Sequence, residues 1–437
     1  MDIIQIEPIM LQGKVKIPPS KSVAHRAIIA AALSGEPCRV ENIALSKDIQ
    51  ATLGCMEAMG ADFSVNEKEG VVTFSGKQKR IPKILRLNCE ESGSTLRFLT
   101  PVALLFGRKV TLSGKGRLMS RPQKPYIDLF ATREISCAIK KDTMTLEGKL
   151  EPGKFSLPGD VSSQFVTGLL FALPMLDGDS EIVITTEMES KGYLDLTLSV
   201  LNDFGIQIIN ENYRRFLIPG GQKYKGTDYR VEGDYSQAAF FLVAGAIGCK
   251  LRCDGLDENS LQGDKKILEI LEQTGANVIK HPDGSIGVTP TEAMHGIEID
   301  AREIPDLVPV LAVLCGFLKG ESRIVNAGRL RMKESDRLAA ISSELSRLGL
   351  DIEEGVDYLK IQGTQILCGE TVSSWNDHRI AMALAVAACR CEGAVTITGA
   401  KEAVKKSFPD FFEVYQGLQQ GPKTLMKFGQ EITEEEG

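Results

Sequence analysis

The sequence contains few aromatic residues: they make up 6% of the 437 positions and include one Trp. Glycine, in contrast, occurs 42 times. Many glycines and few aromatic side chains are typical of an α/β chain with numerous tight turns. The length exceeds what one compact core organises, and it predicts two or three domains.

Segments that would direct the chain to a membrane are missing. No apolar run reaches the ~18 residues of a spanning helix, and the longest, residues 304–318, contains Asp306 and two prolines. The first ten residues carry Asp2 and Glu7 and lack the basic start of a secretory signal. We therefore expect a soluble, cytoplasmic protein with no membrane partner.

Metal-binding cysteine spacings are also missing. Ten cysteines are scattered along the chain, and the closest pairs, Cys249 with Cys253 and Cys389 with Cys391, do not form a C-x-x-C motif. In a reducing compartment such residues are buried thiols. We expect no metal site.

The sequence has fewer basic residues (51 Lys and Arg) than acidic ones (58 Asp and Glu), and its formal net charge is −7. This deficit argues against a nucleic-acid-binding protein that relies on a global positive field. It leaves room for a local basic pocket. An acidic protein that binds an anion must gather its Lys and Arg side chains in one place.

One pattern recurs along the chain. An Asp opens an amphipathic helix, the helix ends at a Gly, and a short strand follows. Copies begin at Asp48, Asp195, Asp264 and Asp336, with a weaker copy at Asp128, about 70 residues apart. The closing Gly reaches the left-handed conformation of a helix C-cap at low cost. The pattern predicts an internal repeat of helices and hairpins.

Two breaks in the repeat mark domain junctions. They are the stiff Pro18-Pro19-Ser20 segment and Val231-Glu232-Gly233. If the chain crosses between lobes at both points, the first strand belongs with the C-terminal half. We expect residues 19–230 to form one domain and residues 1–18 with 231–420 to form the other. Residues 421–437 are expected to be a frayed tail.

Polar and basic residues gather where buried helices are expected to begin. The runs are Ser20-Lys21-Ser22 with Arg26, Glu91-Ser92-Gly93-Ser94, Gly114-Lys115-Gly116-Arg117 with Arg121, Asp160-Val161-Ser162-Ser163-Gln164, Met332-Lys333-Glu334-Ser335-Asp336-Arg337, Asn376-Asp377-His378-Arg379 and Lys405-Lys406. Each run alone also fits ordinary helix capping or a solvated surface. In a repeated architecture, however, equivalent helix starts converge, and their dipoles and cations would bind a ligand with several negative charges.

In this order, the motifs resemble the enolpyruvyl transferase family, and within it the 5-enolpyruvylshikimate-3-phosphate synthases, from Lys21 to about Phe412. The strongest matches are Lys21-Ser22 with Arg26, Ser162-Ser163-Gln164, Lys333 to Arg337, Asp377-His378-Arg379 and Lys406. The resemblance implies an α/β fold of two similar domains joined by two crossover strands. Each domain would hold three βαβαββ units with buried helices, an inside-out α/β barrel.

The resemblance also implies an activity. The enolpyruvyl (1-carboxyvinyl) group of phosphoenolpyruvate would pass to the 5-hydroxyl of shikimate 3-phosphate, with release of phosphate, in chorismate and aromatic amino acid biosynthesis. The partners would be these two small molecules and no nucleic acid. No metal or cofactor is implied, the chain is expected to be a monomer, and the family's inhibitor glyphosate should bind beside the unsubstituted Gly93.

Individual roles follow from the resemblance alone. Asp306 matches the proton acceptor, Glu334 the proton donor, and Lys21 a residue that touches both substrates. The implied contacts of shikimate 3-phosphate are Lys21, Ser22, Arg26, Ser162, Ser163, Gln164, Ser190, Asp306 and Lys333. The implied contacts of phosphoenolpyruvate are Lys21, Gly93, Arg117 or Arg121, Arg337, Arg379 and Lys406.

The implied chemistry sets requirements on two carboxyl groups. Glu334 must carry a proton at the right moment, so burial should raise its pKa. Because the charges of Lys333 and Arg337 oppose this shift, the negative charge of the ligand must partly neutralise them. Asp306 must stay ionised, which a neighbouring Lys21 would favour.

The sequence departs from the family pattern at three places: Glu91 replaces a frequent Asn, Phe98 replaces a Pro after Arg97, and Arg329 replaces an Asn. That Asn contacts shikimate 3-phosphate in some members, and Arg329 could serve there as a phosphate donor.

Two alternatives share the repeat. The sister enzymes that use UDP-N-acetylglucosamine rely on a loop Cys and on an Asn after the first Lys. Here Ser22 follows Lys21, and residues 107–121 contain no Cys. A non-catalytic anion-binding protein is the other alternative, but it would give Asp306 and Glu334 no task.

Overall fold

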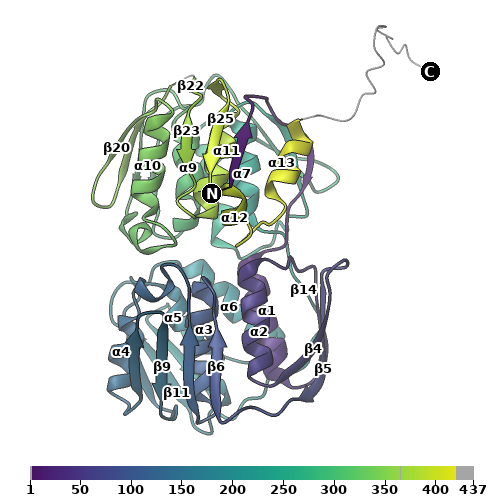
Figure 1. Cartoon of the computed structure of the whole chain (residues 1–437), viewed down its shortest axis with the longest axis vertical. Helices are drawn as coiled ribbons and strands as arrows, with labels where there is room; N and C mark the ends of the chain where they lie inside the picture. Colours follow the sequence, from purple (N-terminus) through teal and green to yellow (C-terminus); the bar gives the residue numbers. More distant parts are fainter. Residues whose placement is uncertain (1, 365, 420–437) are drawn as a thin grey trace, which may run out of the picture.

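The computed structural model describes residues 2–364 and 366–419, which form two lobes stacked along the long axis of the molecule (Figure 1). Buried apolar side chains form two separate cores. One core draws on residues 23–231, and the other combines residues 4–17 with 235–418. The domain bounds expected from the sequence stay a prediction, and Val231, placed there in the C-terminal domain, packs into the first core. The expected tail, residues 421–437, lies outside the described residues.

The N-terminal lobe contains three copies of one supersecondary unit. The first comprises α1 (Lys21–Ser34), β3 (Pro37–Glu41), α2 (Lys47–Ala58), β4 (Ala61–Asn66) and β5 (Val71–Gln78), completed by β14 (Tyr229–Arg230). The second comprises β6 (Ile84–Asn88), α3 (Gly93–Leu104), β7 (Lys109–Ser113), α4 (Lys124–Ala131), β8 (Ser136–Lys140) and β9 (Thr143–Glu147). The third comprises β10 (Lys154–Leu157), α5 (Ser163–Ala172), β11 (Ser180–Ile184), α6 (Lys191–Asp203), β12 (Ile209–Glu211) and β13 (Arg215–Ile218).

The C-terminal lobe repeats this plan. Its first unit comprises β2 (Gln12–Lys16), α7 (Tyr235–Ala246), β15 (Lys250–Asp254), α8 (Ile267–Gln273), β16 (Asn277–Lys280) and β17 (Ile286–Thr289). The second comprises β18 (Glu298–Asp300), α9 (Val308–Cys315), β19 (Glu321–Val325), α10 (Arg337–Arg347), β20 (Asp351–Glu354) and β21 (Leu359–Gln362). The third contains β22 (Leu367–Cys368), β23 (Thr371–Ser373), α11 (His378–Ala388), β24 (Cys391–Glu392), β25 (Val395–Thr398), α12 (Ala400–Val404), α13 (Phe411–Gln419) and β1 (Ile3–Ile6).

Sheet topology confirms the βαβαββ repeat. In the second unit β6 pairs parallel with β7, β7 pairs antiparallel with β9, and β8 and β9 form a hairpin. The third unit has the same order, β10-β11-β13-β12, and in the C-terminal lobe β18-β19-β21-β20 repeats it. The described strands form separate small sheets and do not close into a barrel, while the central helices are buried.

Two crossover segments join the lobes. Pro19 and Gly233 form an antiparallel bridge, in which the Ser20 N–H donates to the Glu232 carbonyl (2.7 Å) and the Asp234 N–H to the Pro18 carbonyl (2.9 Å). The bridge places the starts of α1 and α7 next to each other. Because β1 and β2 precede the first crossing, the C-terminal lobe takes two strands from the start of the chain, whereas β14 completes a sheet of the N-terminal lobe just before the return.

The central helices are buried on all sides, as their composition requires. Every residue of α7, α9 and α11 is buried. Such helices are apolar all round, so their polar residues concentrate at the first turn, where free N–H groups need acceptors. Ser20 caps α1, Ser92 caps α3 and Asp377 caps α11. Within the described residues, no helix combines the length and apolar character needed to cross a bilayer.

Candidate active site

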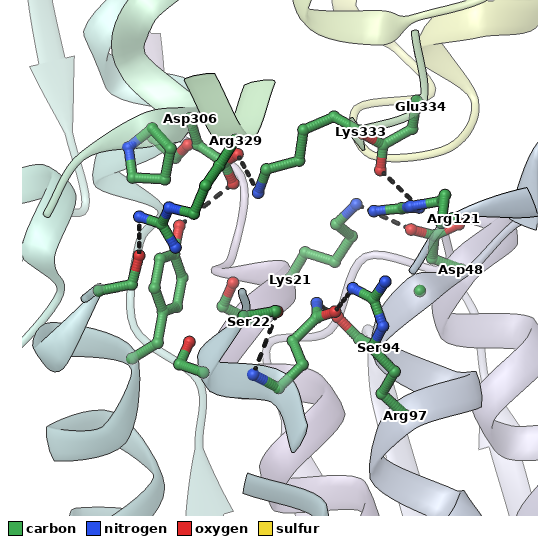
Figure 2. A pocket seen from close by; sticks show the side chains of 18 of the residues that line it. Lys21, Ser22, Asp48, Ser94, Arg97, Arg121, Asp306, Arg329, Lys333 and Glu334 are labelled. Carbon is green, nitrogen blue, oxygen red and sulfur yellow. Dashed lines mark hydrogen bonds and ion pairs between the residues drawn. The ribbon is translucent and has the colours of Figure 1, made fainter. Parts of the chain in front are cut away.

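A pocket between the lobes collects these helix starts (Figure 2). It contains about 1070 Å³ of empty space, part of it open to solvent. The predicted site residues that line it are Lys21, Ser22, Arg26, Gly93, Arg121, Ser162, Ser163, Gln164, Ser190, Asp306, Lys333, Glu334, Arg337 and Arg379. Arg117 and Lys406 are not among the lining residues. Sequence positions almost 360 residues apart therefore share one cleft.

Lys21 stands at the first position of α1 between two acidic residues. Its Nζ lies 2.8 Å from Asp48 Oδ2, and its backbone N–H donates to Asp234 Oδ2 at 3.1 Å. Asp48 lies in the first turn of α2 and Asp234 caps α7, so Lys21, at the start of α1, contacts the starts of two other helices. Its Nζ is paired with Asp48 and not with Asp306, contrary to the expectation from the sequence.

The Arg26 guanidinium lines the pocket and is held by three hydrogen bonds within the N-terminal lobe. Its Nε donates to Thr197 Oγ1 (2.8 Å), Nη1 to the Ser22 carbonyl (2.7 Å) and Nη2 to the Tyr193 carbonyl (3.0 Å). The guanidinium lies 5.0 Å from the centre of the Phe98 ring. Burial lowers the pKa of Arg26 to about 10. Arg26 thus fixes Ser22 and α6, and a substrate contact for it stays a proposal.

The start of α5 presents a polar wall. Ser162 caps the helix, and Gln164 Oε1 accepts from Arg97 Nη1 at 2.8 Å. Gln164 Nε2 donates to Ser94 Oγ at 3.1 Å (Figure 2). Ser163 is buried beside them. These bonds hold the Gln164 amide in one orientation toward the pocket.

Ser190 is held in the left-handed region at φ 58°, just before α6. Its Oγ accepts from Arg329 Nη2 at 3.1 Å and donates to the Arg302 carbonyl at 3.4 Å. Arg329 is paired with Glu189 through its Nε. The Arg that departs from the family pattern therefore lies in the pocket, beside a serine implied in substrate binding.

Asp306 lies among three cations of the C-terminal lobe. Arg337 Nη1, Arg379 Nη2 and Lys333 Nζ lie 2.9, 3.0 and 3.4 Å from its carboxylate oxygens. Burial raises the pKa of Asp306, but the charges of Arg379, Lys333 and Arg337 outweigh burial and hold the pKa well below its usual value. Asp306 is therefore ionised, through these cations and not through Lys21.

Glu334 connects the two lobes. Its Oε2 lies 2.7 Å from Arg337 Nη2, and its Oε1 lies 3.5 Å from Arg121 Nη1 of the N-terminal lobe. Burial raises the pKa of Glu334, but the charges of Arg337 and Arg121 prevail and hold it well below the usual value. The cations Arg337, Arg121 and Lys333 together outweigh desolvation, so burial alone does not raise the Glu334 pKa.

Arg337 is fixed from behind by Asp377. Arg337 Nε lies 2.8 Å from Asp377 Oδ2, which also accepts from Ser335 Oγ at 3.0 Å. The Asp377 side chain is fully buried, and its Oδ1 accepts from the Arg379 N–H at 2.9 Å. One carboxylate thus caps α11 and orients the arginine that reaches both Asp306 and Glu334.

Gly93 and Arg121 form the opposite wall. A Cβ built on Gly93 would lie 3.0 Å from Arg121 Nη1, so the absence of a side chain leaves room for the guanidinium. The alternative residue, Arg117, is exposed and outside the pocket. The structure therefore favours Arg121 of the two.

Lys406 is buried next to the pocket, and its charge is paired with an acidic side chain of the other lobe. Its Nζ lies 2.6 Å from Glu91 Oε2 and 2.7 Å from the Asn376 carbonyl. Glu91, which stands where the family often has Asn, therefore forms an ion pair with Lys406 across the lobe junction.

Sequence reasoning missed several residues that shape the pocket, among them Asp48, Tyr193, Asp234 and Ser236. Asp48 opens one of the repeats and Asp234 follows a junction glycine, so their positions were visible as helix starts. What they face was not visible. Tyr193 lies inside α6, and no local signal distinguishes it from a core aromatic residue.

Comparisons with known proteins agree with this geometry. The family model for EPSP synthase (3-phosphoshikimate 1-carboxyvinyltransferase) matches residues 6–415. The chain belongs to this family. Among curated relatives, the 3-phosphoshikimate 1-carboxyvinyltransferases of Clostridium novyi and Clostridium acetobutylicum are 47% and 48% identical to it. The alignments cover 95% and 94% of this chain, and 97% and 96% of theirs.

A solved structure of EPSP synthase from Acinetobacter baumannii superposes with a TM-score of 0.78 at 26% identity, covering 96% of this chain and 98% of that one. Membership in the EPSP synthase family therefore extends over both lobes and the cleft between them.

Proposed function

We propose that this chain transfers the enolpyruvyl group of phosphoenolpyruvate to the 5-hydroxyl of shikimate 3-phosphate and releases phosphate. The observation that carries the proposal is the position of Arg337, which contacts both Asp306 (2.9 Å) and Glu334 (2.7 Å). Two carboxylates held by one arginine provide a proton acceptor and a proton donor a short distance apart.

We assign the two walls of the pocket to the two substrates. The hydroxyl and amide groups of Ser162, Ser163, Gln164 and Ser190 suit the ring hydroxyls and phosphate of shikimate 3-phosphate, with Lys333 and Lys21 as cations. Arg121, Arg337 and Arg379 suit the carboxylate and phosphate of phosphoenolpyruvate. Arg329 would supply a further donor on the shikimate 3-phosphate side.

The reaction needs one proton on carbon and one removed from oxygen. Glu334 gives a proton to the methylene carbon of phosphoenolpyruvate, while Asp306 takes the proton of the attacking 5-hydroxyl. The adduct then loses phosphate, which leaves with the proton of Asp306. A methyl proton of the adduct returns to Glu334, and the double bond is restored.

The surrounding cations keep Glu334 ionised, so it must gain its proton after phosphoenolpyruvate binds. The negative charges of phosphoenolpyruvate offset those of Arg121 and Arg337, and burial then dominates and raises the Glu334 pKa. Lys333, whose pKa burial lowers to about 8, still carries its proton at neutral pH and provides a positive charge for the adduct.

The location, oligomeric state, pathway and inhibitor of the protein are proposed together with the reaction. We propose that the chain acts as a cytoplasmic monomer in aromatic amino acid biosynthesis and that glyphosate competes with phosphoenolpyruvate beside Gly93. Unimpaired turnover at millimolar glyphosate would contradict that last point.

The test is a measurement of inorganic phosphate released from purified protein. We expect release with shikimate 3-phosphate and phosphoenolpyruvate, and none when UDP-N-acetylglucosamine replaces the acceptor. Release with the nucleotide sugar alone would assign the sister activity, and binding of both substrates without release would indicate a non-catalytic protein.

A further inference from the structure

Three buried oxygen atoms meet where the lobes touch beside the pocket. The Tyr193 hydroxyl lies 3.2 Å from Asp306 Oδ2 and 3.3 Å from Asp264 Oδ2. Tyr193 comes from α6 of the N-terminal lobe, whereas the carboxylates lie on two short turns of the C-terminal lobe, η3 (Gly263–Lys266) and η4 (Pro305–Leu307). The contact therefore depends on how the lobes are arranged.

The backbones hold this contact in place. A Cβ built on Gly192 would lie 2.9 Å from the Cα of Gly263, so α6 and η3 touch through two glycines, each next to a residue of the contact. No larger residue fits there without separating Tyr193 from Asp264. Packing at the lobe junction thus places the Tyr193 hydroxyl between the Asp264 and Asp306 carboxyl groups.

Proton counting limits the charge states of this group. A phenol carries one proton and can donate it to one carboxylate. If both carboxyl groups were ionised, the second would face the Tyr193 oxygen with no proton between two acceptors, in a buried site where such contacts are costly. Both short contacts of the Tyr193 oxygen can be hydrogen bonds when one carboxyl group keeps its proton and donates it to that oxygen.

The surroundings decide which carboxyl group keeps the proton. Asp306 has Arg337, Arg379 and Lys333 within ion-pair distance. Asp264 is 4% exposed, its Oδ1 has no hydrogen-bond partner, and within the described residues it forms no ion pair. A buried carboxyl group without a cation is the one that stays neutral.

The charges around Asp264 point the same way. Burial raises the pKa of Asp264 to about 7, and the negative charges of Asp306 and Asp234 add to this effect, against the opposing charge of Arg379 and a hydrogen bond with Ser236. Burial also raises the pKa of Tyr193 well above its usual value, so the hydroxyl keeps its proton.

We propose that Asp264 is a positioning residue that works as a neutral acid, donating its proton to the Tyr193 oxygen and thereby aiming the Tyr193 O–H at Asp306. The proposal rests on the proposed function, in which Asp306 accepts the proton of the 5-hydroxyl. No proton passes from Asp264 to substrate; its role is to fix one oxygen of Asp306 and leave the other free to act.

Loss of this proton should impair the enzyme. When Asp264 ionises, its proton goes to solvent, the Tyr193 hydroxyl is shared by two anions, and Asp306 loses its donor and gains a negative neighbour. The rate should therefore fall at alkaline pH in two steps, the first from Asp264 and a later one from Lys333, whose pKa is about 8.

The first test compares pH profiles of kcat/KM for the wild type and Asp264→Asn, which keeps a neutral donor. We expect the variant to retain at least a third of the neutral rate and to lack the first alkaline step, so that the fall between pH 7 and 8 shrinks from severalfold to less than twofold. Asp257→Asn, on an exposed Asp, should match the wild type. An unchanged first step in Asp264→Asn would overturn the proposal.

A second test needs no substrate and so separates this inference from the proposed function. The pKa of Asp264 is higher in the folded protein (about 7) than the ordinary 3.8, so the folded state binds the extra proton and stability falls as pH rises between these values. Asp264→Asn should lack that slope in denaturant unfolding, and its advantage over the wild type should grow from pH 5 to 7.5. A constant difference would contradict a neutral Asp264.

A third variant tests the proposal even if Asp264→Asn does not fold. Tyr193→Phe removes the link and leaves Asp264 in place. Turnover should drop at every pH, because Tyr193 lines the pocket, but the first alkaline step should shrink as it does in Asp264→Asn. A full first step in Tyr193→Phe would mean that Asp264 acts on Asp306 by charge alone and not through the hydroxyl.

Discussion

Among single residues, the two proposed proton-transfer carboxylates differ in what surrounds them. Asp306 is held by cations of its own lobe, whereas Glu334 reaches Arg121 in the other. Asp306→Asn and Glu334→Gln keep size and polarity but remove the exchangeable proton site. We expect each to lower kcat roughly 10²–10⁴-fold with unchanged folding, measured by phosphate release and thermal unfolding.

The matched control for this pair is the exposed Glu269→Gln, which should leave the rate unchanged. A near-native rate in either pocket variant would remove the role assigned to that residue.

Gly93 sets the space available to one arginine. Its φ is not in the left-handed region, so alanine is tolerated by the backbone, but the added Cβ would lie 3.0–3.2 Å from the Arg121 guanidinium. Displacing the guanidinium weakens a charge-assisted contact worth about 1.5–3 kcal/mol. Gly93→Ala should raise the KM for phosphoenolpyruvate roughly tenfold and change that for shikimate 3-phosphate little.

Steady-state kinetics with each substrate varied in turn would measure this effect. Gly54→Ala provides the control, because no atom lies within 4 Å of the added Cβ. Equal increases in both KM values would show that the whole lobe junction had shifted, and not Arg121 alone.

Much of the residue-level site was predictable, for a physical reason. Polar residues at the start of an apolar helix must satisfy free N–H groups, so runs such as Ser162-Ser163-Gln164 stand out in a sequence. Pairings were not predictable. Glu91 with Lys406 and Asp264 with Tyr193 join residues far apart in the chain, and only packing brings them together.

Among secondary-structure elements, the important feature is the coupling between adjacent helix starts. Asp377 caps α11 and neutralises Arg337 at the start of α10. Asp377→Ala would remove the fully buried carboxylate that pairs with the Arg337 Nε and would leave Arg337 with Asp306 and Glu334 only. Breaking a buried ion pair costs up to about 3–5 kcal/mol. We expect a loss of that order in the free energy of unfolding, measured with denaturant.

Asp336→Ala is the comparison at the element level. Asp336 also caps a helix, but its side chain is 30% exposed and its partner Arg331 also pairs with Glu354. Removing it should cost only about 1 kcal/mol, the ordinary value for a cap. Similar losses in both variants would argue against a special role for the Asp377–Arg337 pair.

Across the whole molecule, the two lobes meet through charged side chains that substrates also need. Glu91 of the N-terminal lobe holds Lys406 of the C-terminal lobe, and both are mostly shielded from solvent. Glu91 is thus an internal anion competing for a cation proposed to bind phosphoenolpyruvate. Glu91→Gln should lower the KM for phosphoenolpyruvate about two- to fivefold, because a partly exposed ion pair contributes little on its own.

Glu90→Gln is the matched control, since Glu90 pairs with Lys115 on the surface. A higher KM in Glu91→Gln would mean that Glu91 positions Lys406 for the ligand and does not compete with it.

The sequence by itself determined the repeat, the buried helices and the clustering of basic residues at helix starts, because periodicity, capping and dipoles act over a few residues. It also indicated two crossings, since a proline pair and a glycine break interrupt the pattern. Only the tertiary structure decided which charges meet. It paired Lys21 with Asp48, put Arg121 in the pocket with Arg117 outside it, and placed Asp264 against Tyr193, because those contacts depend on how distant elements pack within and between the lobes.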